Sequence, residues 1–203
     1  MGLKIAVKKT PSGPVLVEDF TTGIDDWTLS TYYSNANTSW FNGNSMRHYV
    51  NTSGARGTTA GWIVGIAGNF DIEINFEALT SGGSGIYQFY AYMKTTQGTG
   101  AGNDYLRLQS QSNLAGLTHT LVAGGITQES VTIGPNVWTG RYRWVRSEND
   151  YTTYYESGSG WVEGETTTQA GWGTMYLMTG CWCNTAFITT LMYSVTVNTG
   201  TIV

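Results

Sequence analysis

The chain has 203 residues, a formal net charge of −4 and a pI near 5.0. Charged residues make up only 12% of it, whereas 27 residues are glycine and the aromatic residues comprise 8 Trp, 13 Tyr and 6 Phe. This composition excludes a disordered chain, which would be charge-rich and aromatic-poor, and the ten basic residues form no run that would attract nucleic acid. We expect one large folded domain.

The first 14 residues differ from the rest of the chain. Pro11 and Pro14 enclose a Ser-Gly pair and break regular structure, so we expect an N-terminal arm at 1–14 and the folded domain at 15–203. The apolar run of the arm is too short for a secretory signal, and no stretch is long enough for a membrane-spanning helix. The sequence therefore predicts synthesis in a cytoplasm without a signal peptide, and no membrane span.

Short apolar and aromatic runs follow, separated by Gly, Asn, Ser and Asp, and no amphipathic helix of useful length interrupts them. The clearest run is FDIEINFEA at 70–78, where apolar and polar residues alternate as in a half-buried strand. About a dozen strands separated by turns indicate an antiparallel sandwich or barrel. We expect strands at 15–20, 27–33, 40–41, 46–50, 61–66, 70–78, 86–94, 104–110, 118–123, 128–133, 138–146, 151–156, 172–183 and 187–197.

The stretch from Trp138 to Glu156 predicts a β-hairpin, because four small or polar residues at 147–150 separate two runs rich in Trp, Tyr, Val and Thr. Side chains alternate between the two faces of a strand. We expect one face to pack in the core and the other to be exposed. The core face carries Trp138, Tyr142 and Trp144, and the exposed face carries Arg141, Arg143, Tyr154 and Glu156.

The strand predicted at 172–183 also has two faces. One carries Met175, Leu177, Cys181 and Cys183, and the other carries Trp172, Tyr176 and Trp182. Two cysteines on the same face of one strand are badly placed for a mutual disulfide, so we interpret them as small buried apolar residues. His48 and His119 lack the spacing of a zinc site, and no metal site is predicted.

The order of these features resembles a known superfamily over about residues 15–198. An EDF triplet at 18–20 precedes Trp27, the FDIEINFE strand follows, and then come the hairpin RWVRSENDYTTYYESGSGWVE and a closing apolar strand. This pattern is similar to the concanavalin A-like lectin and glucanase jelly-roll superfamily, especially its laminin-G-like modules. The resemblance implies an all-β fold of two curved antiparallel sheets packed face to face. Calcium often accompanies such domains, but the Asp and Asn residues form no recognisable loop pattern, so no cofactor is predicted.

Two kinds of site are implied by the resemblance. Family 16 glucanases of this fold carry a Glu-x-Asp-x-Glu strand whose outer carboxylates are catalytic. Here the corresponding residues are Glu73 and Glu77, with Asn75 in place of the middle Asp. Residues four apart on a strand lie about 13 Å apart at their Cα atoms, and the alternative interpretation is the solvent face of a half-buried strand.

The second kind is a glycan-binding platform, because sugar rings stack on flat aromatic side chains. The alternative interpretation is that these aromatic residues belong to the core. The candidate residues are Trp172, Tyr176, Trp182, Tyr90 and Tyr92.

The preferred hypothesis for function is a non-enzymatic virion surface protein, either a capsid decoration or a tail-associated protein of a bacteriophage. It rests on the lack of an export signal together with a lectin-like fold. The expected partners are capsid or tail proteins, in a homo-oligomeric or multi-copy arrangement, with adhesion to a cell-surface glycan as an accompanying role. The alternatives are a stand-alone carbohydrate-binding lectin module and, second, a glycoside hydrolase with a degenerate motif.

Overall fold

The computed structural model describes residues 14–21, 26–32, 38–41, 43–156 and 158–203. The predicted arm lies outside these residues apart from Pro14. Every regular element in the described part of the chain is a strand, and none of these residues forms a helix able to cross a membrane. The strands are β1 (Leu16–Glu18), β2 (Trp27–Tyr32), β3 (Thr38–Phe41), β4 (Met46–Thr52), β5 (Arg56–Lys94), β6 (Tyr105–Gln111), β7 (Leu117–Ala123), β8 (Ile126–Gly134), β9 (Thr139–Ser147), β10 (Asp150–Glu156), β11 (Trp161–Thr168) and β12 (Met175–Ile202).

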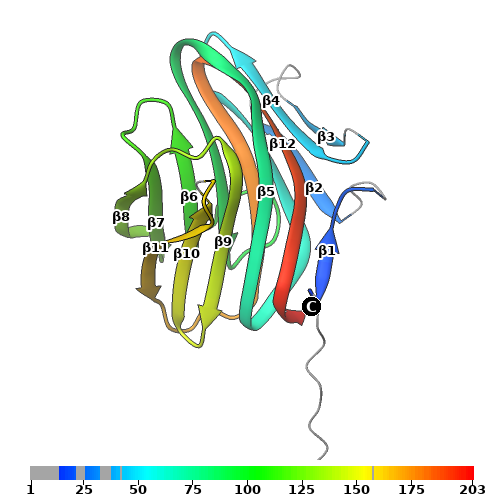
Figure 1. The fold of residues 1–203 in the computed structure, drawn as a ribbon, viewed down its shortest axis with the longest axis vertical. Helices are drawn as coiled ribbons and strands as arrows, with labels where there is room; N and C mark the ends of the chain where they lie inside the picture. The colour runs from blue at the N-terminus through cyan, green and yellow to red at the C-terminus, as the bar shows by residue number, and fades with distance from the viewer. Residues whose placement is uncertain (1–13, 22–25, 33–37, 42, 157) are drawn as a thin grey trace, which may run out of the picture.

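Two of these elements, β5 and β12, are unusually long because each passes from one layer of a sandwich to the other (Figure 1). The paired segments of β12 and β5 run antiparallel. Leu177 of β12 lies opposite Met93 of β5, and Cys183, six residues later in β12, lies opposite Tyr87, six residues earlier in β5. The predicted segments 61–66, 70–78 and 86–94 are parts of β5, and 187–197 is part of β12.

The first layer contains β2, residues 56–66 of β5, residues 175–184 of β12, residues 86–94 of β5, and then β6, β7 and β8. The second layer contains β3, β4, residues 186–202 of β12, residues 70–83 of β5, and then β9, β10 and β11. Strand β1 pairs with β12 at the edge of the second layer. The all-β, antiparallel two-layer prediction is confirmed.

The core lies between the layers and follows the predicted alternation. Phe76 of the second layer stacks on Phe89 of the first at a centroid distance of 4.3 Å, and Tyr142 lies 4.6 Å from Phe76. Burial of these rings is the main driving force that holds the layers together. Both cysteines are free and buried, as predicted.

The hairpin of β9 and β10 has the predicted faces. Tyr142 and Trp144 are buried, Trp138 packs against the core, and the register pairs Thr153 with Trp144. The turn is shorter than predicted, because Ser147 and Asp150 already pair as strand residues.

Glu148 in this turn has a φ of 58°, in the left-handed region that favours glycine. We expect Glu148→Gly to raise the free energy of unfolding by about 1 kcal/mol, because the strain at a non-glycine residue is removed. The turn contact through the Glu148 backbone N–H, which donates to Asn69 Oδ1 at 2.7 Å, would remain. Urea unfolding measures the change. Ser147→Gly is the matched control and should destabilise, since glycine weakens a strand; a gain for Ser147→Gly as large as that for Glu148→Gly would contradict this explanation.

Buried polar side chains also connect the two layers. Ser39 Oγ lies 2.6 Å from His48 Nδ1, and His48 Nε2 lies 3.0 Å from Thr179 Oγ1 across the core. Farther along the sandwich, His119 Nδ1 lies 3.1 Å from Thr153 Oγ1. Both histidines are fully buried, and burial lowers the pKa of His48 to about 3 and that of His119 to about 4. Both imidazoles are therefore neutral near pH 7.

Candidate functional site

A groove of about 400 Å³ lies on the outer face of the first layer, opposite to the face that packs in the core. Its volume falls in the range of small-molecule sites. No Asp, Glu, Lys or Arg is among the lining residues. These residues are Gly57, Thr59, Tyr90, Tyr92, Thr99, Gly100, Ala101, Met178 and Trp182.

The aromatic side chains reach this face by strand alternation. Phe89, Ala91 and Met93 point into the core, so Tyr90 and Tyr92 point outward, and their rings meet edge to face at 5.4 Å. Glycine on the neighbouring strand makes room for them. A Cβ at Gly180 would approach the Tyr90 ring to 2.8 Å and the carbonyl of Thr58 to 2.4 Å.

Polar side chains of β6 lie next to the two tyrosines of the groove. Tyr90 is opposite Gln109 and Tyr92 is opposite Arg107 in the ladder between β5 and β6. Gln109 Nε2 donates to Gln88 Oε1 at 2.8 Å, whereas Gln109 Oε1 is buried without a hydrogen-bond partner among the described residues. Burial of an unpaired acceptor is costly unless another group pairs with it.

Burial also sets the protonation of the two tyrosines. It raises the pKa of Tyr90 well above its ordinary value, and it raises the pKa of Tyr92, with the Arg107 guanidinium acting in the opposite direction. Both phenols therefore keep their hydroxyl protons at neutral pH. A ligand in the groove would meet aromatic rings, hydroxyl groups and backbone carbonyls.

Three of the five predicted glycan-binding residues come together in this groove, namely Tyr90, Tyr92 and Trp182. Tyr176 points to the same outer face but lies over Gly65, outside the groove lining. The placement of Trp172 on this face is wrong. Its side chain is 6% exposed, belongs to the core and packs edge to face on Tyr151 at 5.4 Å, because β12 begins only at Met175.

The two candidate catalytic carboxylates lie on the opposite surface of the sandwich, on the outer face of the second layer. Glu77 accepts a hydrogen bond from the Tyr193 hydroxyl at 2.5 Å, and Glu73 is 3.5 Å from the Arg141 guanidinium. Neither lines the groove. Ile74 and Phe76, between them, point into the core. This placement fits the alternative interpretation, the solvent face of a half-buried strand.

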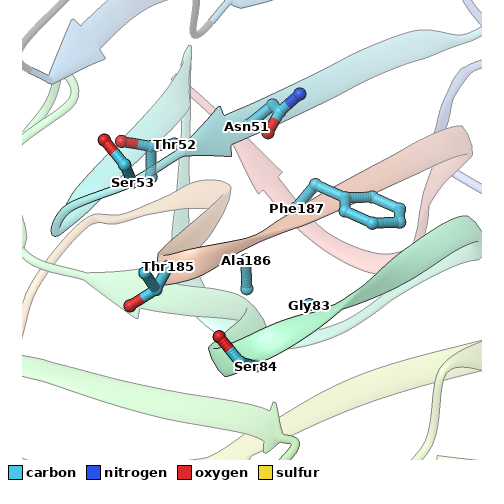
Figure 2. Close-up of a pocket in the computed structure, with 8 residues that line it drawn as sticks. All are labelled: Asn51, Thr52, Ser53, Gly83, Ser84, Thr185, Ala186 and Phe187. Carbon is cyan, nitrogen blue, oxygen red and sulfur yellow. The ribbon is translucent and has the colours of Figure 1, made fainter.

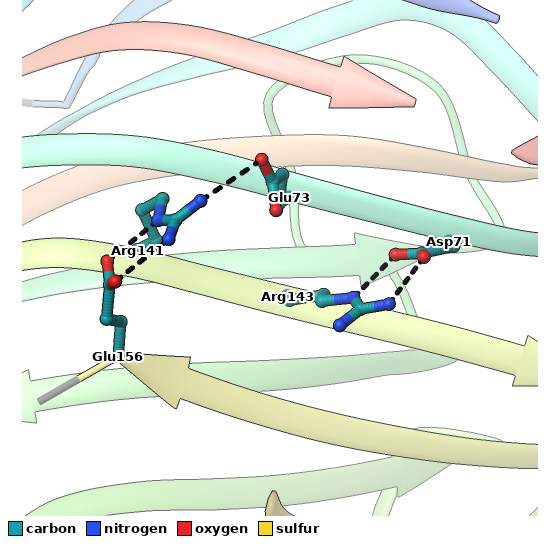
Figure 3. A network of polar contacts seen from close by, with 5 residues as sticks. All are labelled: Asp71, Glu73, Arg141, Arg143 and Glu156. Atoms are coloured by element: carbon teal, nitrogen blue, oxygen red, sulfur yellow. Dashed lines mark hydrogen bonds and ion pairs between the residues drawn. The ribbon is translucent and has the colours of Figure 1, made fainter. Parts of the chain in front are cut away.

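The same face carries a network of ion pairs between β5, β9 and β10 (Figure 3). Arg141 donates to both carboxylate oxygens of Glu156, at 2.7 and 2.8 Å, and this pairing lowers the pKa of Glu156. Arg143 donates to both oxygens of Asp71, at 2.7 and 2.6 Å. The prediction that Arg141, Arg143, Tyr154 and Glu156 form the outward face is thus confirmed. Because these charges are paired with one another, the face is typical of an ion-pair network that stabilises neighbouring strands.

A second depression, of about 440 Å³, lies among three chain segments at 51–53, 83–84 and 185–187 (Figure 2). Half of its lining residues bear hydroxyl groups, and Phe187, 37% exposed, is the one aromatic residue in the lining. It therefore lacks the aromatic floor found in the groove of the first layer.

Sequence reasoning missed the loop residues Thr99, Gly100 and Ala101, and also Thr59 and Met178. The pattern of Gly, Thr and Ala at 98–102 indicates a loop, but it does not indicate on which part of the sheet the loop packs. Met178 could have been found, since it alternates in phase with Tyr176 and Trp182. Among the described residues, no group of three or more His, Cys, Asp or Glu is arranged to hold a metal ion.

Comparison with known proteins gives matches to solved structures alone: no family model matches this chain, and neither does any curated protein sequence. The Bacillus licheniformis β-glucanase is 13% identical with a TM-score of 0.62, covering 94% of this chain and 100% of its own. The legume lectin-like domain from Entamoeba histolytica is 9% identical with a TM-score of 0.65, covering 86% and 90%. LamAcat from Zobellia galactanivorans is 7% identical with a TM-score of 0.64, covering 93% and 98%.

These similarities extend over most of each chain at identities that indicate the fold alone. They agree with the two antiparallel layers and the core between them. The chain therefore has the concanavalin A-like jelly-roll fold, which lectin-like domains and β-glucanases share.

Proposed function

We propose that this protein is a non-enzymatic, lectin-like carbohydrate-binding protein whose site is the groove of the first layer. The observation that carries the proposal is the groove itself, where Tyr90, Tyr92 and Trp182 line one cavity with hydroxyl and backbone groups. Aromatic faces beside such hydrogen-bonding groups suit a sugar ring, which has apolar C–H faces and a hydroxyl rim.

The same groove argues against glycoside hydrolysis. Both retaining and inverting mechanisms need a pair of carboxyl groups flanking the scissile bond. The groove lining contains no carboxylate, and Glu73 and Glu77 lie on the other surface, engaged by Arg141 and Tyr193. We expect no release of reducing ends from β-glucans. Release by the wild type that Glu73→Gln abolishes would overturn the non-enzymatic assignment.

Binding can be tested with a glycan array followed by calorimetric titration of the best-bound glycan. We expect Trp182→Ala to weaken binding at least about tenfold, because it removes a stacking surface from the groove. Phe187→Ala is the matched control, since it removes an exposed aromatic ring outside the groove, and should leave the affinity unchanged. A wild type that binds no glycan at millimolar protein, or equal losses for both variants, would refute the proposal.

The location on a virus particle stays a prediction, as do the capsid or tail partners and the multi-copy arrangement. Mass spectrometry of purified particles tests it directly: the chain should be present in many copies. Its absence from particles would remove the virion hypothesis while leaving the carbohydrate-binding proposal intact.

A further inference from the structure

The loop at 95–103, between β5 and β6, folds back over the outer face of the first layer. Gln97 Nε2 donates to the carbonyl of Ile63 at 2.7 Å, and Thr59 Oγ1 donates to the carbonyl of Thr99 at 3.3 Å. Ile63 and Thr59 belong to residues 56–66 of β5, which are separated from Lys94 by a segment of β12. The loop therefore crosses three adjacent strands.

Lys94 fixes the underside of this loop. Its side chain is fully buried, and its ammonium donates to the carbonyl oxygens of Gly98, at 2.6 Å, and Gly100. Neither partner is a carboxylate, so the cation is held by backbone dipoles, and burial lowers the pKa of Lys94 to about 8. Hydrogen bonds from a charged donor are about twice as strong as neutral ones.

Glycine at position 61 lets the loop come this close. A Cβ at Gly61 would lie 2.2 Å from the carbonyl oxygen of Gly98, a distance that real Cβ atoms do not reach. A side chain there would therefore push the loop away from the strand. Lys94 thus binds the carbonyl groups of Gly98 and Gly100, and the absence of a side chain at Gly61 leaves room for Gly98.

The result is a wall on one side of the groove. The wall consists of Thr99, Gly100 and Ala101. The rest of the groove is lined by Met178 and Trp182 of β12 and by Tyr90 and Tyr92 of β5, among other residues. The wall carries no charge of its own. The ammonium that holds it is buried beneath the loop and is engaged by carbonyl groups.

We propose that Lys94 is a positioning residue and that residues 99–101, held by it, form the specificity-determining wall that makes the groove selective for uncharged glycans. This inference rests on the proposed carbohydrate-binding function. It adds that the shape of the ligand is selected by a loop whose position depends on Lys94 and Gly61, neither of which needs to touch the ligand. The groove lining holds no cation, and the neighbouring Arg107 guanidinium is engaged by the Tyr92 ring and by Thr120 Oγ1, so an acidic glycan would gain no charge partner from the lining.

Lys94→Met keeps the length and packing of the stem but removes the ammonium, and Gly61→Ala moves the loop without altering the charge. The probe is an array of neutral and sialylated or uronate-containing glycans, followed by titration of the best-bound neutral oligosaccharide. We expect both variants to bind it about tenfold more weakly and to change the rank order of glycans on the array. Hydrogen exchange at the Thr95 amide, which donates to the Asp104 carbonyl at the base of the loop, should accelerate at least about tenfold, while the amides of β9 and β10 keep their protection.

Ile126→Ala, at an exposed position of β8 outside the groove lining, is the control and should keep the wild-type ranking. Rank order is the deciding measurement, because a general loss of stability would weaken all glycans alike. If the wild type binds glycans and both variants retain its ranking, this inference fails and the proposed function stands. A preference of the wild type for acidic glycans would also overturn it. If the wild type binds no glycan, the proposed function fails, and this selectivity fails with it.

Discussion

Lowering the pH from 7 to 5 is expected to reduce the free energy of unfolding by about 4 kcal/mol, because two buried histidines are neutral in the folded protein. His48 has a folded pKa of about 3 and His119 one of about 4, against an ordinary value near 6.5. Between these values the unfolded chain binds protons that the folded chain does not. The contribution to stability is fully present above pH 6.5 and is lost progressively as the pH falls toward the folded values.

Urea unfolding at pH 7, 6 and 5 measures this loss. The slope of the unfolding free energy against pH near pH 5 should correspond to the uptake of about two protons on unfolding. The control is the double variant His48→Gln with His119→Gln, whose glutamines do not titrate. Its stability at pH 7 will be lower, but its slope between pH 6.5 and 5 should be nearly flat. A wild-type slope no steeper than that of the double variant would contradict this prediction.

Phe76→Ala should lower the free energy of unfolding by about 4 kcal/mol, the range observed when a large buried aromatic side chain is deleted. Phe76 is 1% exposed, connects the two layers by its contact with Phe89, and also packs on Tyr142 of its own layer. Its removal leaves a cavity at the centre of the interface, and a core built from two paired layers cannot collapse to fill it.

Thermal and urea unfolding test this second prediction. Because a loss of this size can abolish folding, Phe76→Leu serves as a milder variant, with an expected loss of about 1 kcal/mol. Phe187→Ala provides the matched control, since the same side chain is removed where it is 37% exposed, and it should cost much less. Similar losses for Phe76→Ala and Phe187→Ala would show that the contacts between layers do not dominate stability.

The sequence predicted the fold best in strands that have one buried face and one solvent-exposed face. The FDIEINFEA run and the hairpin of β9 and β10 both follow strict alternation, so their core and solvent faces could be assigned residue by residue. Tyr90, Tyr92 and Trp182 could be named in advance because each is an aromatic residue in phase with an outward face.

Other features could not be obtained from a local pattern. Trp172 was misplaced because alternation was extended past the start of β12 at Met175, into a turn where it no longer applies. Strand β11 was missed because its run of Glu, Gly and Thr has few apolar residues to alternate. The wall at residues 99–101 depends on long-range contacts from Lys94 and residues 59–63, and glycine-rich loops carry no sign of such partners.

The passage of β5 and β12 between the layers has a consequence for how the molecule can be divided. A cut in either element separates strands of both layers, so no contiguous fragment contains one complete layer without strands of the other. Complementary fragments would have to exchange strands in both layers at once to reassemble. We therefore expect the domain to behave as a single cooperative unit, with comparable hydrogen-exchange protection in the centres of the two layers, and to tolerate new chain ends in its hairpin turns far better than within β5 or β12.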